Sequence, residues 1–276
     1  MGARFPARLH VLLARDGRSG VVLRRGPAKS VCAVGWDRIK DRFTIGQWLR
    51  GRIYERRADL SPDGQHLIYF AMNGRWRDPV GGSWTAISRA PYLKALVLLA
   101  KGDCWHGGGL FLDNRRFWLN DGYGHETQLV APHLQPVTDY PWHEAYGGEC
   151  PGVYFIRLQR DGWAMKHTAT DATGDTITRF EKRVSGHWLL CKLAHASLAR
   201  RQGLGVYHDT HELRHTRTGE TVPLPGWEWA EVDGGRVVWA EAGRLHAGRL
   251  EAQGLRSPKL LHDFNAMTFE RREAPY

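Results

Sequence analysis

The sequence predicts an all-β protein, a β-propeller of five or six four-stranded blades, and three observations lead to this expectation. Residues 57–72 read as a strand, a tight Ser61-Pro-Asp-Gly64 turn and a second strand. Pro62 presets φ for the turn, and Gly64 supplies its positive-φ position. Similar strand-turn-strand signals recur about 48 residues apart over the first four copies, which is a propeller-like period. The 12 Trp and 32 Gly suit twisted, stacked sheets, in which rings fill the space between sheets and glycines turn corners.

The strand after this turn, residues 66–72, is apolar on both faces. Successive side chains of a strand point to opposite sides, and here the even-numbered and the odd-numbered positions are both mostly apolar. Such a strand needs cover on both faces. The pattern therefore predicts a sheet that lies between two other sheets.

The remaining strands are expected in chain order, with turns at Asp-Gly or Asp-Asn signals. No amphipathic helix is expected, and the apolar run at 152–158 is interpreted as the first strand of a fourth blade. A propeller must close its ring, so we expect residues 261–269 to pair with the N-terminal strands in a single domain spanning 1–276. The other expected strands include 9–14, 20–23, 31–36, 42–49, 84–88, 95–100, 107–112, 116–119, 126–131, 163–167, 176–183, 186–191, 205–208, 227–232, 236–240 and 243–250.

One hairpin also resembles a known family. Leu60-Ser-Pro-Asp-Gly-Gln-His-Leu-Ile-Tyr-Phe70 is similar to the Ser-Pro-Asp-Gly hairpin of TolB-type, WD40-like bacterial β-propeller repeats, and residues 232–245 look like a degenerate copy. The resemblance implies a propeller fold and a role in binding. It implies no catalytic residues.

Positive charge is concentrated near the N-terminus. The net charge is +10, and residues 1–60 contain 14 Lys and Arg against 5 Asp and Glu. Arg50, Arg52, Arg56 and Arg57 lie among aromatic residues, a mixture that suits phosphate contacts and base stacking. The sequence therefore predicts an acidic partner, either a protein or a nucleic acid, on this face. A solvated basic surface above core aromatics is the alternative.

Three short runs combine rings, imidazoles and carboxylates near expected loops. They contain Trp105 and His106, then Asp121, Tyr123 and His125, and finally Trp142 and His143. Such groups converging from several loops could bind a sugar or another small molecule. The alternative is that the rings pack between sheets while the histidines are solvated.

No signature of a cofactor, metal site or nucleophile stands out. The four cysteines form no Cys-x-x-Cys pair, and Gly107-Gly-Gly109 is not followed by the Lys and Ser or Thr of a phosphate-binding loop. The histidines at 208, 211 and 215 are interpreted as hairpin residues. The apolar run at 9–14 is shorter than the core of a signal peptide, and no stretch has the length of a membrane span, so we expect a cytoplasmic protein without a membrane partner.

Together these patterns favour a non-catalytic binding or scaffold module. Its partner would be acidic and would meet the basic N-terminal face. The alternative is a carbohydrate-active or other hydrolytic enzyme that uses loop carboxylates such as Asp121 and Glu144, which would need the separation of a glycosidase pair.

Overall fold

The computed structural model describes residues 5–26, 29–142, 146, 149–170, 172, 174–197, 205–251 and 254–276. The chain divides into two compact units. Unit 1 comprises the residues up to Leu9 together with Gln159–Ala266, and unit 2 comprises His10–Leu158 together with Met267–Tyr276. The boundary passes through the first strand and through the end of the helix. Each unit is described by itself.

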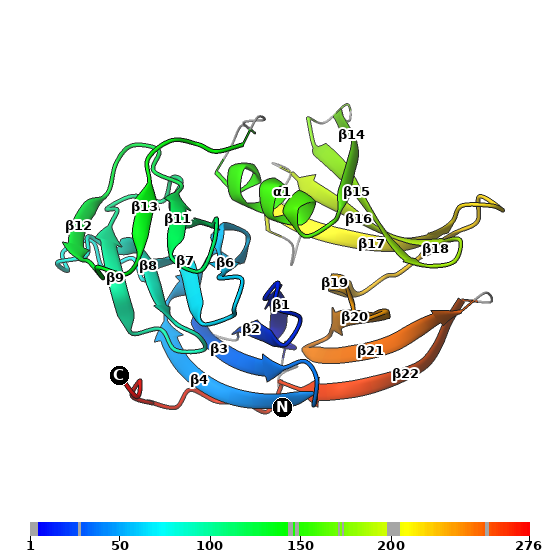
Figure 1. Cartoon of the computed structure of the whole chain (residues 1–276), viewed down its shortest axis with the longest axis horizontal. Coiled ribbons are helices and arrows are strands. Elements are labelled where there is room, and N and C mark those ends of the chain that lie inside the picture. The colour runs from blue at the N-terminus through cyan, green and yellow to red at the C-terminus, as the bar shows by residue number, and fades with distance from the viewer. Residues whose placement is uncertain are drawn as a thin grey trace. The chain divides into compact units, whose positions relative to one another are not determined.

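Unit 2 contains three sheets, which run from blue to green in Figure 1. The N-terminal sheet has the order β1-β2-β3-β4, formed by Arg8–Leu13, Ser19–Arg25, Ser30–Asp37 and Arg42–Arg50. The middle sheet has the order β12-β9-β8-β7-β5, with β6 also paired to β7; the strands are Glu126–Leu129, Ala95–Ala100, Ser83–Arg89, His66–Met72, Arg52–Ile53 and Asp59–Leu60. The small sheet has the order β10-β11-β13, formed by Gly109–Phe111, Arg116–Leu119 and Gln135–Val137.

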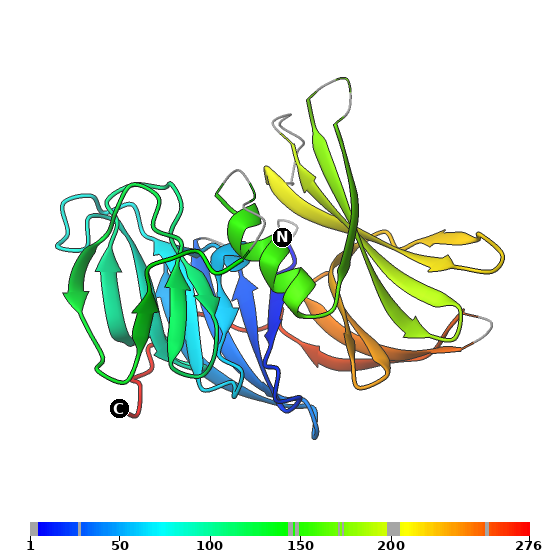
Figure 2. The same cartoon turned by 45° about the horizontal axis from the view of Figure 1, so that its top comes forward.

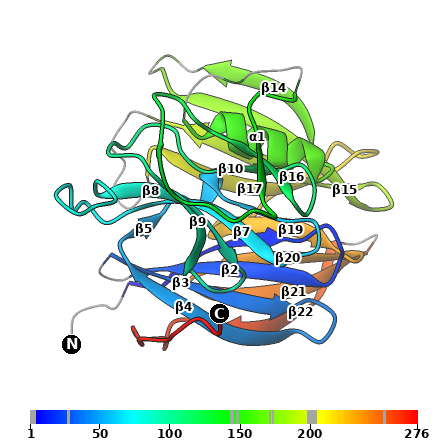
Figure 3. The ribbon, with the colours of Figure 1, turned by 60° about the vertical axis from the view of Figure 1, so that its left-hand side comes forward.

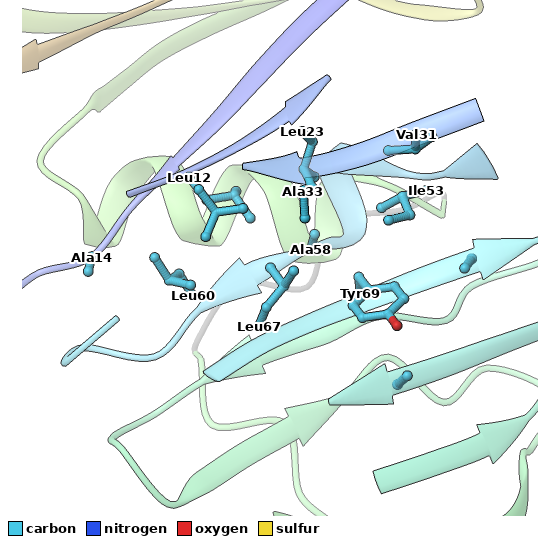
Figure 4. Close-up of a cluster of buried hydrophobic side chains, with 13 residues drawn as sticks. Leu12, Ala14, Leu23, Val31, Ala33, Ile53, Ala58, Leu60, Leu67 and Tyr69 are labelled. Carbon is cyan, nitrogen blue, oxygen red and sulfur yellow. The ribbon is translucent and has the colours of Figure 1, made fainter. Parts of the chain in front are cut away.

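Strand β7 is covered on both faces, as the sequence predicts. On one side Leu67, Tyr69 and Ala71 join a core with residues of the N-terminal sheet, as Figure 4 shows. On the other side Ile68 packs with Phe111 and Phe117 of the small sheet. The middle sheet therefore lies between two others. Two apolar faces on one strand are stable only in that position.

The turn before β7 has the predicted geometry. Gly64 has φ +72°, and its N–H donates to the carbonyl of Ser61 at 2.8 Å. The Ser61 hydroxyl donates to Asp63 at 2.6 Å. Local turn chemistry thus accounts for the geometry of this hairpin. Contacts with distant residues add to it, because the N–H of Asp63 donates to the Asn114 side chain at 3.0 Å and the carbonyl of Pro62 accepts from Asp16 at 2.9 Å.

The strand expected at 152–158 is wrong, because Pro151–Arg160 forms the helix α1. Pro151 occupies the first turn, where its missing N–H costs nothing. Val153, Tyr154, Ile156 and Arg157 are buried along one side of the helix. A short apolar run fits either a helix or a strand, so its periodicity alone cannot separate the two.

Arg157 connects this helix to the short 3₁₀ turn η1 (Glu55–Arg57). It is buried, and its guanidinium donates to the carbonyl oxygens of Glu55, at 3.2 Å, and of Ala58. The Nε2 of His10 lies 2.9 Å from the same guanidinium. A buried cation with this many oxygen and nitrogen neighbours fixes α1 to β1 and to the segment around η1.

Unit 1 contains two antiparallel sheets, seen in yellow-green and orange in Figure 2. The five-stranded sheet β14–β18 consists of Ala164–Thr170, Thr176–Ser185, Trp188–Ala196, Tyr207–His215 and Thr221–Pro223. The four-stranded sheet β19–β22 consists of Trp227–Asp233, Arg236–Glu241, Arg244–Glu251 and Gly254–Asp263.

Buried polar contacts join the two sheets of unit 1. The indole N–H of Trp163 donates to Glu231 at 2.7 Å, and Lys182 donates to the same carboxylate at 2.8 Å. Lys192 is almost wholly buried, and its ammonium lies 3.0 Å from Nε2 of His211 and 3.3 Å from the carbonyl of Ala230. Every buried charged group named here has hydrogen-bond or ion-pair partners, and these contacts offset the free-energy cost of removing the charges from water.

The expected closed propeller of five or six four-stranded blades is wrong. The described residues form five separate sheets of three to six strands, none of which closes on itself. They are antiparallel except for the parallel pair β11–β13. The turns at 16, 63 and 113 each join two strands of a different sheet, so their spacing reports how many residues each sheet uses. Successive sheets that do not close into a ring produce the same spacing.

The expected closure by terminal strands is also wrong. In the part of the chain that the structure describes, β1 hydrogen-bonds to β2 and β22 to β21, and the two terminal strands do not pair with each other. The C-terminal residues 267–276 form no strand. The longest described helix, α1, has 10 residues, and none of the described segments forms a helix with the length and hydrophobicity needed to cross a membrane.

Candidate functional site

The four arginines predicted to form a binding face separate into two pairs. Arg50 and Arg52 are exposed, and each lies over a ring: Arg50 is 4.6 Å from the ring centre of Phe269, and Arg52 is 4.4 Å from that of Tyr54. Arg56 and Arg57 are buried. Only the first pair can meet a partner from solvent.

Arg57 is an internal anchor with a relative exposure of 1%. It donates to the carbonyl oxygens of Cys104, at 3.0 Å, and of His106, and it forms an ion pair with Glu149. Its Nε lies 3.4 Å from the sulfur of Cys150. A planar guanidinium can donate hydrogen bonds to several acceptors at once, so this side chain anchors the backbone carbonyls of residues 104 and 106.

Residues 101–108 and 120–125 form what we call the loop cluster. The first segment follows β9 and leads into β10, and the second follows β11 and leads into β12. Because β9 pairs antiparallel with β12, and β10 with β11, both segments emerge at the same end of their sheets. Figure 3 shows β9 and β10, the strands on either side of the first segment, together with β7 and β8. The fold therefore brings together two of the three ring-and-histidine runs.

A chain of hydrogen bonds runs through this cluster from Asp121 to Thr85. The carboxylate of Asp121 lies 2.5 Å from Nδ1 of His125, and Nε2 of His125 lies 3.0 Å from the Thr85 hydroxyl. The N–H of Gly108 donates to the same hydroxyl at 2.8 Å. An ionised Asp121 only accepts, so Nδ1 carries the imidazole proton and Nε2 accepts from Thr85.

His125 is neutral in this arrangement. Burial lowers its pKa below the ordinary value of 6.5, and this effect outweighs the hydrogen bond and the charge of Asp121, which raise the pKa. Lys101 also lowers it. The side chain of His125 is only 2% exposed, whereas that of Asp121 is 48% exposed. The histidine thus fixes a carboxylate that faces solvent.

His106 and Tyr123 complete the exposed part of the cluster. Their rings meet edge to face with centres 5.4 Å apart, and Nδ1 of His106 lies 3.4 Å from the Asn120 side-chain oxygen. Tyr123 is 83% exposed and has φ +70°, and His106 has φ +57°. Positive φ is strained for both residue types, and such strain gathers at functional sites. Trp105, in the same loop, is 53% exposed.

Trp142, the described residue of the third predicted run, is not part of this cluster. Trp142 packs edge to face on Trp118 with ring centres 5.8 Å apart, and Tyr140 packs on the same indole at 4.9 Å. These rings surround the small core of Leu110, Val153 and Ile156. His143 and Glu144 lie outside the described residues. Trp142 therefore has a packing role.

Sequence reasoning missed three residues that position the cluster. Thr85 lies on β8, far along the chain from His125, and nothing local marks its hydroxyl. Asn120 is buried and donates to the carbonyls of Gly107, at 3.2 Å, and Glu149, at 3.1 Å. Lys101 pairs with Asp103 at 3.1 Å. Strand register brings Thr85 to His125, and it brings Asn120 to Gly107 at the end of the pair β10–β11.

The histidines at 208, 211 and 215 lie on strand β17. His208 stacks on His195 with ring centres 4.5 Å apart, and His211 is buried beside Lys192. Among the residues that the structure describes, no three His, Cys, Asp or Glu side chains come together in a group that could hold a metal ion.

Comparison with known proteins adds little. No protein-family model matches the chain, and no curated protein matches it. A solved structure of one of two prolyl endopeptidases, studied for the role of inter-domain dynamics in catalysis and specificity, aligns at 11% identity with a TM-score of 0.23. The alignment covers 88% of this chain and 47% of that chain, so this chain spans about half the length of that enzyme. A likeness this weak carries no argument about fold or activity.

We expect substitution of a buried arginine to destabilise the protein more than substitution of an exposed one. We expect Arg57→Ala to lower the free energy of unfolding by about 3–5 kcal/mol, because it leaves Glu149 and two carbonyls without their cation. Arg52→Ala removes an exposed side chain and should change stability by less than about 0.5 kcal/mol. Urea unfolding followed by tryptophan fluorescence measures both. Equal effects would contradict the buried-anchor role.

The lowered pKa of His125 predicts a pH dependence of stability. The unfolded chain takes up the proton near pH 6.5, before the folded protein does, so this group's contribution is complete above that pH. It declines as pH falls from there to the folded-state pKa, below which no further loss occurs. His66, His246 and His262, whose pKa values burial also lowers, act in the same direction.

His125→Gln should therefore make the free energy of unfolding less sensitive to pH between 7.5 and 5. Urea titrations at the two pH values measure the difference. His187→Gln is the control, because His187 is exposed on the other unit. An identical pH slope in wild type and His125→Gln would show that this histidine is not held neutral.

Proposed function

We propose that the protein is a non-catalytic binding module whose loop cluster takes a small polar ligand of the sugar type. The observation that carries the proposal is the Tyr123 ring, which is exposed beside His106 and belongs to the same loop as the Asp121 carboxylate that His125 holds in place. An aromatic face beside fixed hydrogen-bonding groups suits a ligand that has both apolar C–H faces and hydroxyls.

The cluster offers two kinds of acceptor to such a ligand. The Asp121 carboxylate can accept further hydrogen bonds besides the one from His125. The Asn120 side chain donates to two carbonyls, so its oxygen accepts from Nδ1–H of His106, and Nε2 of that ring is left as an acceptor. These groups are held by the hydrogen-bond chain and by Arg57, and an ordered site loses less entropy when it binds.

Binding is favoured over catalysis because the Thr85 hydroxyl cannot reach a substrate. The order Thr85–His125–Asp121 has the arrangement of a nucleophile, a base and an orienting carboxylate. Thr85 is 0% exposed, and its oxygen already accepts from the N–H of Gly108. Its role is to fix the imidazole. The resemblance of residues 60–70 to TolB-type hairpins supports a binding role in the same sense.

The acidic partner remains a separate prediction. Since Arg56 and Arg57 are internal, the surface that could meet such a partner keeps Arg50 and Arg52 of the original four. Their guanidiniums are exposed and stacked on rings, which leaves their N–H donors available to phosphates or carboxylates.

Titration with neutral oligosaccharides tests the proposed ligand class. In calorimetry against cello-, xylo- and malto-oligosaccharides, we expect one series to bind, and Tyr123→Ala and Asp121→Asn to raise its Kd at least about tenfold, near 1.4 kcal/mol. Phe5→Ala is a matched control, because Phe5 is also 83% exposed and lies in unit 1.

Two results would contradict the proposal. One is the absence of binding to all three series. The other is an unchanged Kd in Tyr123→Ala. Release of reducing ends by the wild type that stops in Asp121→Asn would instead favour the hydrolase.

A further inference from the structure

The C-terminal residues 267–276, which we call the tail, lie along one face of unit 2. They run beside β4, as the red trace in Figure 1 shows, and they continue to the turn 90–94 that joins β8 to β9. We call this surface the tail-docking face. It is formed by Arg24, Gln47, Trp48, Arg50, Arg89, Tyr92 and Lys94.

Two aromatic side chains of the tail occupy separate sockets. The Phe269 ring centre lies 5.9 Å from that of Trp48, and the guanidinium of Arg50 lies 4.6 Å above it. The Tyr276 hydroxyl accepts from the N–H of Arg89 at 3.0 Å and donates to the carbonyl of Lys94 at 2.6 Å.

Cations and a second ring complete the Tyr276 socket. The guanidinium of Arg89 lies 5.0 Å from the Tyr276 ring centre, and the ammonium of Lys94 lies 5.4 Å from it. Tyr92 meets the same ring edge to face at 6.2 Å. Cation–aromatic contacts therefore recur at both sockets.

Between the sockets, Gln47 connects the tail to the body of the unit. Its side-chain oxygen accepts from the N–H groups of Leu93, at 2.7 Å, and Lys94, at 2.9 Å. These two donors determine the orientation of the amide, so its NH₂ group faces the tail and donates to the carbonyl of Arg272 at 2.8 Å. Arg24 donates to the carbonyl of Met267 at 3.1 Å.

The manner of these contacts resembles peptide recognition more than sheet formation. In the described part of the chain, β4 pairs only with β3, and the tail adds no strand to it. Side chains instead hold tail carbonyls, which every peptide has, and two sockets select the aromatic side chains. Backbone contacts with side-chain pockets at set intervals are how proteins bind extended segments.

We propose that the tail-docking face is a binding surface for an extended peptide of a partner protein. The peptide would carry two aromatic residues seven positions apart, as Phe269 and Tyr276 are in the tail. The tail is the resident occupant, and a partner segment with the same spacing replaces it. This inference is independent of the sugar site, because the two surfaces share none of the residues that carry either argument.

The test uses the full chain and a labelled peptide of the tail sequence, Met-Thr-Phe-Glu-Arg-Arg-Glu-Ala-Pro-Tyr. In fluorescence anisotropy we expect Phe269→Ala/Tyr276→Ala, which weakens the resident tail, to bind the peptide at least tenfold more tightly than the wild type. Adding Gln47→Ala to this variant should remove most of that binding. A peptide of the same composition with both aromatic residues moved is the specificity control.

Two outcomes of this titration would overturn the proposal. One is that wild type and Phe269→Ala/Tyr276→Ala bind the peptide equally, or that neither binds it. The other is that the rearranged peptide binds as well as the natural one. Far-UV circular dichroism verifies that each variant is folded.

A second measurement needs no change in the tail. Gln47→Ala in the otherwise natural chain should loosen the tail, so that trypsin cleaves after Arg271 and Arg272 at least fivefold faster. Gln128→Ala is the matched control, because Gln128 also donates its side-chain amide to a carbonyl, that of Pro79, at 2.6 Å. Equal cleavage rates in the wild type and Gln47→Ala would show that the face does not hold the tail and would overturn the proposal.

Discussion

The burial of β7 on both faces is the constraint on which unit 2 depends. Leu67 and Tyr69 need one apolar neighbour, and Ile68 and Phe70 need another, so sheets must cover the strand from both sides. Once the small sheet lies against the middle sheet, the ends of β9 and β11 come together. The loop cluster is a consequence of this stacking, because its two segments follow those strands.

Buried arginines then connect the stacked parts. Arg57 holds the carbonyls of residues 104 and 106, and Arg157 holds the carbonyls of Glu55 and Ala58 and fixes the helix. Each guanidinium leaves water only because several acceptors meet it. The positive charge of the N-terminal segment is for this reason partly internal. A count of basic residues overstates the surface field that a partner would meet.

Arginine beside aromatic rings does not by itself identify the group that it contacts. The pattern around Trp48 and Arg50 is compatible with nucleic acid, yet in the structure these side chains contact Phe269 of the same chain. Cation–aromatic contacts do not distinguish a base from a phenyl ring. The identity of the occupant depends on which segment the fold brings near.

The sequence alone determined the features that depend on neighbouring residues. These are the Ser61–Gly64 turn, the two-faced strand after it, most strand positions and the all-β class, because turn chemistry and side-chain alternation act over a few residues. It also singled out Asp121, Tyr123 and His125 as a group. Only the tertiary structure decided the helix at 151–160, the separate sheets in place of a closed ring, the burial of Arg56 and Arg57, and the partnership of His125 with Thr85. These features depend on packing and register between residues far apart in the chain, about which local pattern carries no information.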